Sequence, residues 1–296
     1  MSSAGASRIV LIGAGSLCSS IVNGVLASGL SAQLILCGRA SESSAARLAQ
    51  LRAMHGASIE TRTGDEETRR ALSDASTALV VLCVKPNQVG TVASLLAGQP
   101  LPAHVSLLSC CAGVTVATLQ AQFRTDRVAR CMPNTAASLR ASATAWFAAT
   151  LPLAHVALIE ELLGAFGTHM RVASECHIDV ATALAGSGTA FVLLYMEAQV
   201  DAGVQLGLSL DQSRQLVVQT FLGSAKLAAA NSGTHLAALR SHVVSPGGTT
   251  AAGLRQLERG GVRAGIADCI NATFERAGEL ARNSVSPVNF SRGENA

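Results

Sequence analysis

A segment near the C-terminus, Ser245-Pro246-Gly247-Gly248-Thr249-Thr250, places two glycines and two threonines just before a helical pattern at residues 251–257. The first turn of a helix presents unpaired N–H groups and a partial positive charge, which suit a small carboxylate. The same residue types also make an ordinary inter-helix turn with an N-cap, and taken alone that interpretation is favoured. A ligand role therefore depends on the rest of the chain.

A second glycine-rich motif, Gly13-x-Gly15-x-x-Cys18, lies at the opposite end of the chain. It follows an apolar strand pattern at residues 8–12 and opens a helical pattern that reaches about residue 28. In dinucleotide folds the first glycine permits a tight turn and the second lets backbone approach the pyrophosphate, while Cys18 stands where a third glycine is common. The motif in this context predicts a dinucleotide site.

The end of the second predicted strand, residues 33–37, indicates which dinucleotide binds. NAD sites usually place Asp or Glu there to hold the ribose hydroxyls, but this strand is followed by Gly38-Arg39-Ala40-Ser41. Arg39 can stack on adenine and pair with a 2′-phosphate, with Ser41 or Ser43 assisting. A solvated loop arginine is the alternative. The pattern favours NADPH and leaves NADH open as a second donor.

Buried strand patterns alternate with helical patterns through the first half of the chain, which predicts an α/β fold with a Rossmann-type doubly wound parallel sheet. Strand signals cease after about residue 172. Residues 178–282 are almost all helical, with breaks at 207, 231–234, 245–248 and 260–261. We therefore expect a dinucleotide-binding domain at residues 1–172, an all-α dimerisation and substrate domain at 173–285, and a polar tail at 286–296.

Composition narrows the function classes. A net charge of +3 and 3% aromatic residues disfavour a nucleic-acid partner. The apolar run 180–196 is interrupted by Gly186-Ser187-Gly188, which predicts an interface helix and no membrane span. There is no signal-peptide pattern, and eight cysteines without a CxxC pair or metal spacing predict no metal site and a cytoplasmic protein, with a Cys110-Cys111 disulfide disfavoured.

The whole chain, from about residue 8 to 282, resembles the pyrroline-5-carboxylate reductase family. The resemblance depends on six segments that occur in order and at the family's spacing. They are Gly13-x-Gly15, Val84-Lys85-Pro86, Ser109-Cys110-Cys111-Ala112-Gly113-Val114, Arg130-Cys131-Met132-Pro133-Asn134-Thr135, Gly186-Ser187-Gly188, and Ser245 to Thr250 with Leu239 upstream and Leu257-Glu258 downstream.

The resemblance implies reduction of 1-pyrroline-5-carboxylate to L-proline by NAD(P)H in a homodimer, with dimers often assembled into larger rings. It implies that the amides of Gly248 and Thr249 hold the substrate carboxylate and that the Thr250 hydroxyl, the expected catalytic group, bonds the ring nitrogen. Substrate would lie at the dimer interface, between the nicotinamide and this segment. The expected substrate residues are Ser187, Ser245, Gly247, Gly248 and Thr249, and the expected cofactor residues are Gly13, Gly15, Ser16, Leu17, Arg39, Val84, Lys85, Pro86, Cys111, Ala112, Gly113 and Asn134.

The chemistry agrees with that expectation, because reducing a cyclic imine needs a positioned hydride donor and a carboxylate anchor but no strong base. The chain departs from the family at Thr189 and Ala136, where proline is usual, and at Phe191, where tyrosine is usual. These departures leave open a related cyclic imine, or a non-catalytic NADPH-binding protein. A 3-hydroxyacid dehydrogenase is disfavoured, because Val192 occupies the place of its catalytic lysine. Catalysis by Lys85 is the weaker interpretation of that residue.

Overall fold

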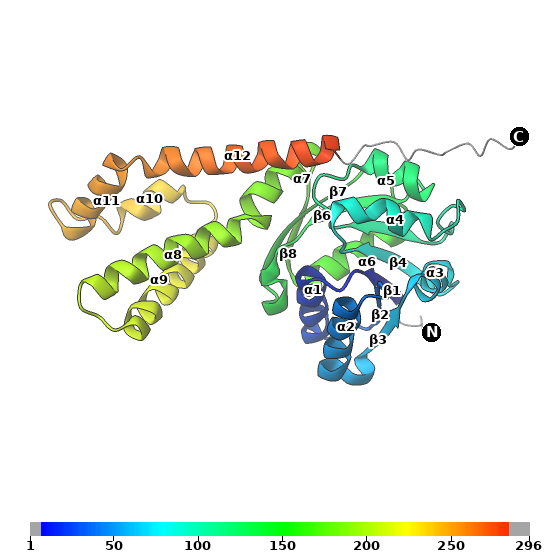
Figure 1. The fold of residues 1–296 in the computed structure, drawn as a ribbon. Coiled ribbons are helices and arrows are strands. Elements are labelled where there is room, and N and C mark those ends of the chain that lie inside the picture. The colour runs from blue at the N-terminus through cyan, green and yellow to red at the C-terminus, as the bar shows by residue number, and fades with distance from the viewer. Residues whose placement is uncertain (1–6, 284–296) are drawn as a thin grey trace, which may run out of the picture. The chain divides into compact units, whose positions relative to one another are not determined.

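The structure, a computed structural model, describes residues 7–283 and divides into two units (Figure 1). One unit contains the described residues up to Ser187 together with those from Thr273 onward, and the other is Gly188–Ala272. The two boundaries fall inside two long helices, Cys176–Gln205 and Val262–Asn283. The first turns of the former and the last turns of the latter therefore belong with the sheet. The predicted tail at 286–296 lies outside the described residues.

An eight-stranded sheet forms the centre of the first unit, in the order β3-β2-β1-β4-β5-β6-β7-β8 (Figure 1). Every neighbouring pair is parallel except β6 and β7, which are antiparallel. The predicted Rossmann-type doubly wound fold is confirmed, with an antiparallel pair added near one edge. The strands are β1 Ser7–Ile12, β2 Ala32–Gly38, β3 Ile59–Thr63, β4 Thr77–Leu82, β5 Ser106–Ser109, β6 Val128–Met132, β7 Ser142–Ala148 and β8 Gly167–Arg171.

Helices cover both faces of the sheet, and this explains why its central strands are continuous apolar runs. Alternate residues of β1 belong to two separate cores, since successive side chains of a strand point to opposite faces. Ile9 and Leu11 pack with α1 and α6, whereas Val10 and Ile12 pack with α4 and α5. The helices are α1 Ser16–Ser28, α2 Glu42–His55, α3 Asp65–Ser73, α4 Val89–Ser94, α5 Val116–Phe123, α6 Leu153–Ala165 and α7 Cys176–Ala181, with 3-10 turns η1 Gly56–Ser58, η2 Pro86–Gln88 and η3 Thr135–Leu139.

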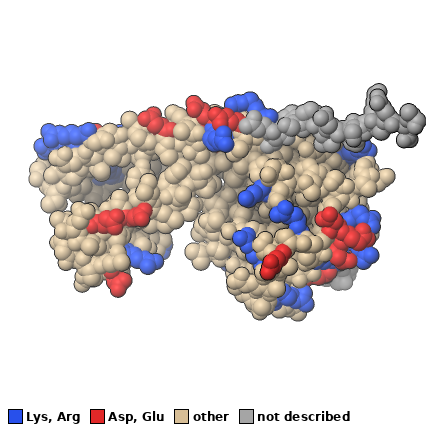
Figure 2. Space-filling view, in the orientation of Figure 1, with Lys and Arg blue, Asp and Glu red and all other residues tan. Residues whose placement is uncertain are grey.

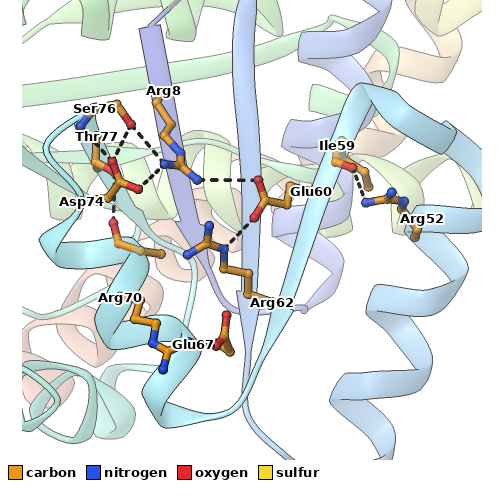
Figure 3. Close-up of polar contacts among 11 residues, drawn as sticks. Arg8, Arg52, Ile59, Glu60, Arg62, Glu67, Arg70, Asp74, Ser76 and Thr77 are labelled. Carbon is orange, nitrogen blue, oxygen red and sulfur yellow. Dashed lines mark hydrogen bonds and ion pairs between the residues drawn. The ribbon is translucent and has the colours of Figure 1, made fainter.

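A polar network joins β1, β3 and the segment that precedes β4 (Figure 3). The Arg8 side chain is only 10% exposed and pairs with Asp74, with Ser76 Oγ at 3.0 Å and with Glu60 Oε2 at 3.6 Å. Glu60 also accepts from Arg62 Nε at 2.7 Å. A nearly buried guanidinium needs such partners, because an uncompensated charge is costly to bury.

A 30-residue helix, Cys176–Gln205, runs from α7 through a π-turn, η4 Thr182–Gly186, into α8 Gly188–Gln205. The predicted apolar run 180–196 lies within this continuous helix, and the π-turn ends at Gly186, the first residue of Gly186-Ser187-Gly188. By length and composition this helix could cross a membrane, and it is the one helix within residues 7–283 that meets that test.

Helices α8, α9 Leu210–Ala230, α10 Leu236–Ser241, α11 Thr249–Arg259 and the first part of α12 Val262–Asn283 build the second unit. The predicted break at Gly207 has a positive φ of 102°, a conformation that glycine adopts without strain. Large apolar side chains are exposed on α8, including Leu193 and Leu194, and Figure 2 shows wide areas without charge on the visible face. An exposed apolar surface of this kind suits an interface between subunits.

Candidate functional site

The glycine-rich turn between β1 and α1 packs against Cys83, the residue that follows β4. Gly13 has a φ of 117°, and a Cβ there would stand 2.6 Å from the Cys83 carbonyl oxygen, so this position requires glycine. Gly15 is the N-cap of α1 and no side chain caps the helix, which leaves the first-turn amides without a side-chain partner. A Cβ at Gly15 would meet nothing within 4 Å. Backbone N–H groups that face open space fit a pyrophosphate.

Cys18, at the place of the third glycine, is fully buried against the sheet. A hydrogen bond with Cys83 and burial raise the pKa of the Cys18 thiol well above its ordinary value. The residue is therefore a small neutral side chain that allows α1 to pack closely on the sheet, the role that the third glycine has elsewhere.

A cavity of about 290 Å³ lies in front of this turn, at the carboxyl ends of β1, β2 and β4. Ligands of open α/β sheets bind at this end of the strands. Five predicted cofactor residues line it, namely Gly13, Gly15, Arg39, Val84 and Lys85, together with Ile12, Ala14, Cys37, Gly38, Ser41, Ser43, Ser44, Arg47, Asp65, Thr68, Cys83, Gln88, Thr91, Val92 and Leu95.

Two arginines, Arg39 and Arg47, line the cavity together with Lys85 and add to its positive charge. With its amide oriented to satisfy the hydrogen bonds, Gln88 accepts from both Arg39 Nη1 at 3.1 Å and Arg39 Nη2 at 3.2 Å. Arg47 Nη1 lies 3.5 Å from the carbonyl oxygen of Ala14 in the glycine-rich turn. Sequence reasoning did not single out Arg47 or Gln88. The signal for Arg47 was its place in the early part of the helix that follows Arg39, where a cation faces the same carboxyl edge of the sheet.

Ser41 and Ser43 also line this cavity, as expected. Ser41 is the N-cap of α2, and its Oγ accepts from Ser44 N at 3.4 Å. A donor hydrogen of the hydroxyl remains for a ligand, because capping uses only an acceptor lone pair. These hydroxyls and the arginines form a donor-rich wall that fits a 2′-phosphate.

The other predicted cofactor residues lie outside this cavity. Ser16 and Leu17 begin α1, and Pro86 begins η2. Cys111, Ala112 and Gly113 follow β5, and Asn134 follows β6, so these loops share the carboxyl edge of the sheet with the cavity.

The loops at this edge are bonded to one another. The Cys111 thiol donates to the Val84 carbonyl oxygen at 3.3 Å, and burial raises the pKa of Cys111 to about 11, so the thiol is neutral and serves as a donor. Cys110 and Cys111 are both free thiols. Ala112 packs against the small buried cluster of Met132, Ala145 and Ile178, in which Met132 ends β6, the next strand of the sheet.

The segment Ser245 to Thr250 belongs to the helical unit and forms a tight turn before α11. Gly248 N donates to the Ser245 carbonyl oxygen at 3.1 Å, and Gly247 has a φ of 69°, the pattern of a type II turn with Pro246 at its second position. A Cβ at Gly248 would lie 2.3 Å from Ser245 Oγ, so a larger residue there would require the Ser245 side chain to rotate away.

The backbone amides available to a ligand at this turn begin at Thr249, one residue later than the expected Gly248. Because the Gly248 N–H is used within the turn, the amide predicted to bind substrate from Gly248 is already bonded. Gly248 is the N-cap of α11 and no side chain caps the helix, so the N–H groups of Thr249 and Thr250 are the first without a side-chain partner. The start of α11 thus retains the features of an anion site.

Ser187, the remaining predicted substrate residue, ends the π-turn in the first unit, where its N–H donates to the Thr182 carbonyl oxygen at 2.8 Å. This bond spans five residues and defines the π geometry. Its side chain is half-buried.

Comparison with known proteins decides the family. Residues 175–280 match the family model described as pyrroline-5-carboxylate reductase dimerisation, and residues 8–113 match the one described as NADP oxidoreductase coenzyme F420-dependent. A pyrroline-5-carboxylate reductase of Pseudomonas aeruginosa is 37% identical over 276 residues, which cover 93% of this chain and 97% of the relative. The chain belongs to the pyrroline-5-carboxylate reductase family.

Solved structures of the pyrroline-5-carboxylate reductase family have the same fold. The enzyme of Streptococcus pyogenes is 30% identical, with a TM-score of 0.80 over 93% of this chain and all of the other. A Plasmodium falciparum pyrroline carboxylate reductase with NADP bound has a TM-score of 0.79 at 24% identity, over 93% of this chain and 98% of the other. The predicted family, fold class and NADP cofactor are confirmed.

Proposed function

We propose that this protein reduces the cyclic imine 1-pyrroline-5-carboxylate to L-proline, with NADPH as the hydride donor. The observation that carries the proposal is the 37% identity to the Pseudomonas aeruginosa pyrroline-5-carboxylate reductase over nearly the full length of both chains. Full-length similarity includes both the dinucleotide turn and the Ser245–Thr250 turn, and the proposed reaction needs both.

The sheet-containing unit holds the cofactor. The α1 amides after Gly15 bind the pyrophosphate, and Arg39 and Arg47 bind the 2′-phosphate, because guanidinium groups form charge-assisted hydrogen bonds to phosphate oxygens. The loops at Val84–Pro86 and at Cys111–Gly113 line the nicotinamide side. When bound, NADPH supplies a hydride to the carbon of the C=N bond.

The Ser245–Thr250 turn holds the substrate. Amides at the start of α11 and the Ser245 hydroxyl bind the carboxylate, and the helix dipole favours its negative charge. The Thr250 hydroxyl forms a hydrogen bond with the ring nitrogen, and this bond stabilises the nitrogen while the C=N bond is reduced. No strong base is needed, since the imine nitrogen is protonated before reduction and positioning supplies most of the rate.

The helical unit forms a homodimer, in keeping with the dimerisation family that it matches and the exposed apolar residues of α8. The Cys176–Gln205 helix packs against a second subunit rather than in a membrane, and dimers assemble further into rings. The protein acts in the cytoplasm on a small imino acid, with no nucleic-acid partner.

A second candidate is the reduction of a related cyclic imine, favoured by Thr189 and Phe191, which replace the family's proline and tyrosine. The test is NADPH oxidation with pyrroline-5-carboxylate and with pyrroline-2-carboxylate, each repeated with NADH. We expect the highest kcat/KM for pyrroline-5-carboxylate with NADPH. A preference for pyrroline-2-carboxylate would select the second candidate, and NADPH binding without turnover of either imine would indicate a non-catalytic protein.

A further inference from the structure

The Asn134 carboxamide links the loop after β6 to the π-turn η4. Its Oδ1 accepts from Ala136 N at 3.1 Å and caps η3, while its Nδ2 donates to the Ala185 carbonyl oxygen at 3.2 Å. These two bonds fix the orientation of the amide, because exchanging the oxygen and nitrogen would place donor against donor and acceptor against acceptor. The side chain is therefore committed to partners within the chain rather than to a cofactor.

The π-turn packs closely on the same loop. A Cβ at Gly186 would lie 3.2 Å from Met132 Cγ and 3.3 Å from Met132 Sδ, and Met132 shares a small buried core with Ile178 and Ala145. A π-turn is rare and persists where surrounding structure supports it, often at functional sites. Asn134 supplies such support through a hydrogen bond to a carbonyl inside the turn.

An ion-pair cluster holds the beginning of the Cys176–Gln205 helix, which contains the π-turn. Glu175 Oε1 accepts from Val116 N at 2.7 Å and from Arg130 Nη1 at 2.6 Å, and Arg130 Nη2 lies 3.2 Å from Asp179 Oδ1. The Arg130 side chain is 2% exposed, so its charge depends on these two carboxylates. The helix is thus bonded at its start to the first residue of α5 and to β6, and at Ala185 to the loop after β6.

We propose that Asn134 is a positioning residue for the reductase: by donating to the Ala185 carbonyl oxygen it holds the π-turn and so sets the place of the Ser187 hydroxyl. This proposal rests on the proposed function, in which Ser187 contacts the substrate. It reassigns Asn134, since the residue acts on substrate binding through the helix and makes no contact with the cofactor through its carboxamide.

The decisive variant is Asn134→Asp, which keeps the acceptor for Ala136 N but sets a second acceptor against the Ala185 carbonyl. Asn231→Asp is the matched control, because Asn231 Nδ2 donates to the Leu227 carbonyl oxygen at 2.8 Å at an exposed helix end. We expect Asn134→Asp to lower kcat/KM for the imine by roughly ten- to a hundredfold, as small misplacements do, and to leave the Kd for NADPH within twofold. The control should leave both unchanged.

A loss of NADPH affinity equal to the loss of kcat/KM would overturn the proposal, since it would mean that the carboxamide contacts the cofactor. An unchanged kcat/KM would overturn it as well. Should Asn134→Asp fail to fold, Gly186→Ala tests the π-turn from the side of Met132, and the same split between kcat/KM and Kd is expected.

A double-mutant cycle with Ser187→Ala tests whether Asn134 affects kcat/KM through the Ser187 hydroxyl. If Asn134 acts by placing the Ser187 hydroxyl, its effect on kcat/KM should largely vanish in the Ser187→Ala background, whereas additive effects would contradict the proposal. Amide hydrogen exchange gives a readout that does not depend on activity. The Ser187 amide should exchange at least about tenfold faster in Asn134→Asp than in the wild type.

Hydrogen exchange also separates the two proposals. An enzyme that reduces no imine would contradict the proposed function, while faster exchange at Ser187 in Asn134→Asp would still support the link between Asn134 and the π-turn. Unchanged exchange in an active enzyme would contradict the link alone.

Discussion

Gly13 lies so close to Cys83 that a Cβ added to it would stand 2.6 Å from the Cys83 carbonyl oxygen. The backbone there also has a φ of 117°, which side chains rarely adopt. Two independent constraints thus require glycine at this position. Gly15, two residues later, has neither constraint, because its φ is −81° and a Cβ there would meet nothing within 4 Å.

This contrast predicts different outcomes for two similar substitutions. Gly13→Ala should destabilise the protein by more than about 2 kcal/mol, since it combines backbone strain with a clash against backbone. Gly15→Ala should fold with nearly wild-type stability but bind NADPH at least about tenfold more weakly, because its methyl group projects where the pyrophosphate approaches. Thermal unfolding and NADPH titration measure the two effects. Wild-type affinity in Gly15→Ala would contradict the assignment of the turn.

Arg39 should determine the preference for NADPH over NADH. Arg39→Ala removes a charge-assisted contact worth about 1.5–3 kcal/mol, which corresponds to a loss of roughly ten- to a hundredfold in NADPH affinity. NADH lacks the 2′-phosphate, so its affinity should change little. Arg69→Ala is a suitable control, because Arg69 is exposed on α3 and does not line the cavity. The ratio of the two Kd values is the measurement, and an equal loss for both cofactors would refute a 2′-phosphate contact.

Most of the sheet and the helix breaks could be predicted from the sequence, because they depend on local chemistry. Residues 9–12 of the first strand form a continuous apolar run, and glycines at 207 and 247 have the positive φ that their turns require. The antiparallel direction of β7 was not predicted. The link between β6 and β7, residues 133–141, is short enough to indicate an antiparallel pair, because a parallel crossover needs about a dozen residues or more.

The parts of the site that sequence reasoning missed depend on contacts between distant residues. The π-turn at Thr182–Gly186 was not predicted, because the residues that contact it, Asn134 and Met132, lie more than forty residues away in the sequence. Arg47 likewise belongs to no motif and reaches the cavity only because α2 follows Arg39 along its edge. Apart from the place of Arg47 early in the helix after Arg39, no local pattern contains these relationships.

Thr250 should be the hydroxyl that matters for catalysis, whereas Thr249 should contribute mainly its backbone amide. Thr250→Ala removes the proposed contact with the imine nitrogen and should lower kcat by about a hundredfold, the lower end of the usual range for a group that assists proton transfer. Thr249→Ala retains the amide at the start of α11 and should remain within about threefold of wild type. Steady-state kinetics with saturating NADPH test both. Full activity in Thr250→Ala would remove this hydroxyl from the mechanism.

Acid should weaken the network that Asp74 forms. Hydrogen bonds from the Ser76 hydroxyl and backbone, together with Arg8, lower the pKa of Asp74 from 3.8 to about 2. Because the folded-state pKa is below the unfolded value, the carboxylate stabilises the fold fully above about pH 4, and this contribution is lost as the pH falls toward 2. The side chain is 32% exposed and screened by solvent, so the contribution is at most about 1–2 kcal/mol.

Urea unfolding of the wild type and of Asp74→Asn at pH 6 and pH 3 measures that contribution. At pH 6 the variant should be the less stable protein, and the gap between the two should narrow at pH 3, where the wild-type carboxylate begins to take up a proton. Asp126→Asn is the control, because Asp126 pairs with Arg127 at a 78% exposed position and should show little difference at either pH. A gap that stays constant between the two pH values would mean that Asp74 stabilises the fold by its shape and neutral hydrogen bonds rather than by its charge.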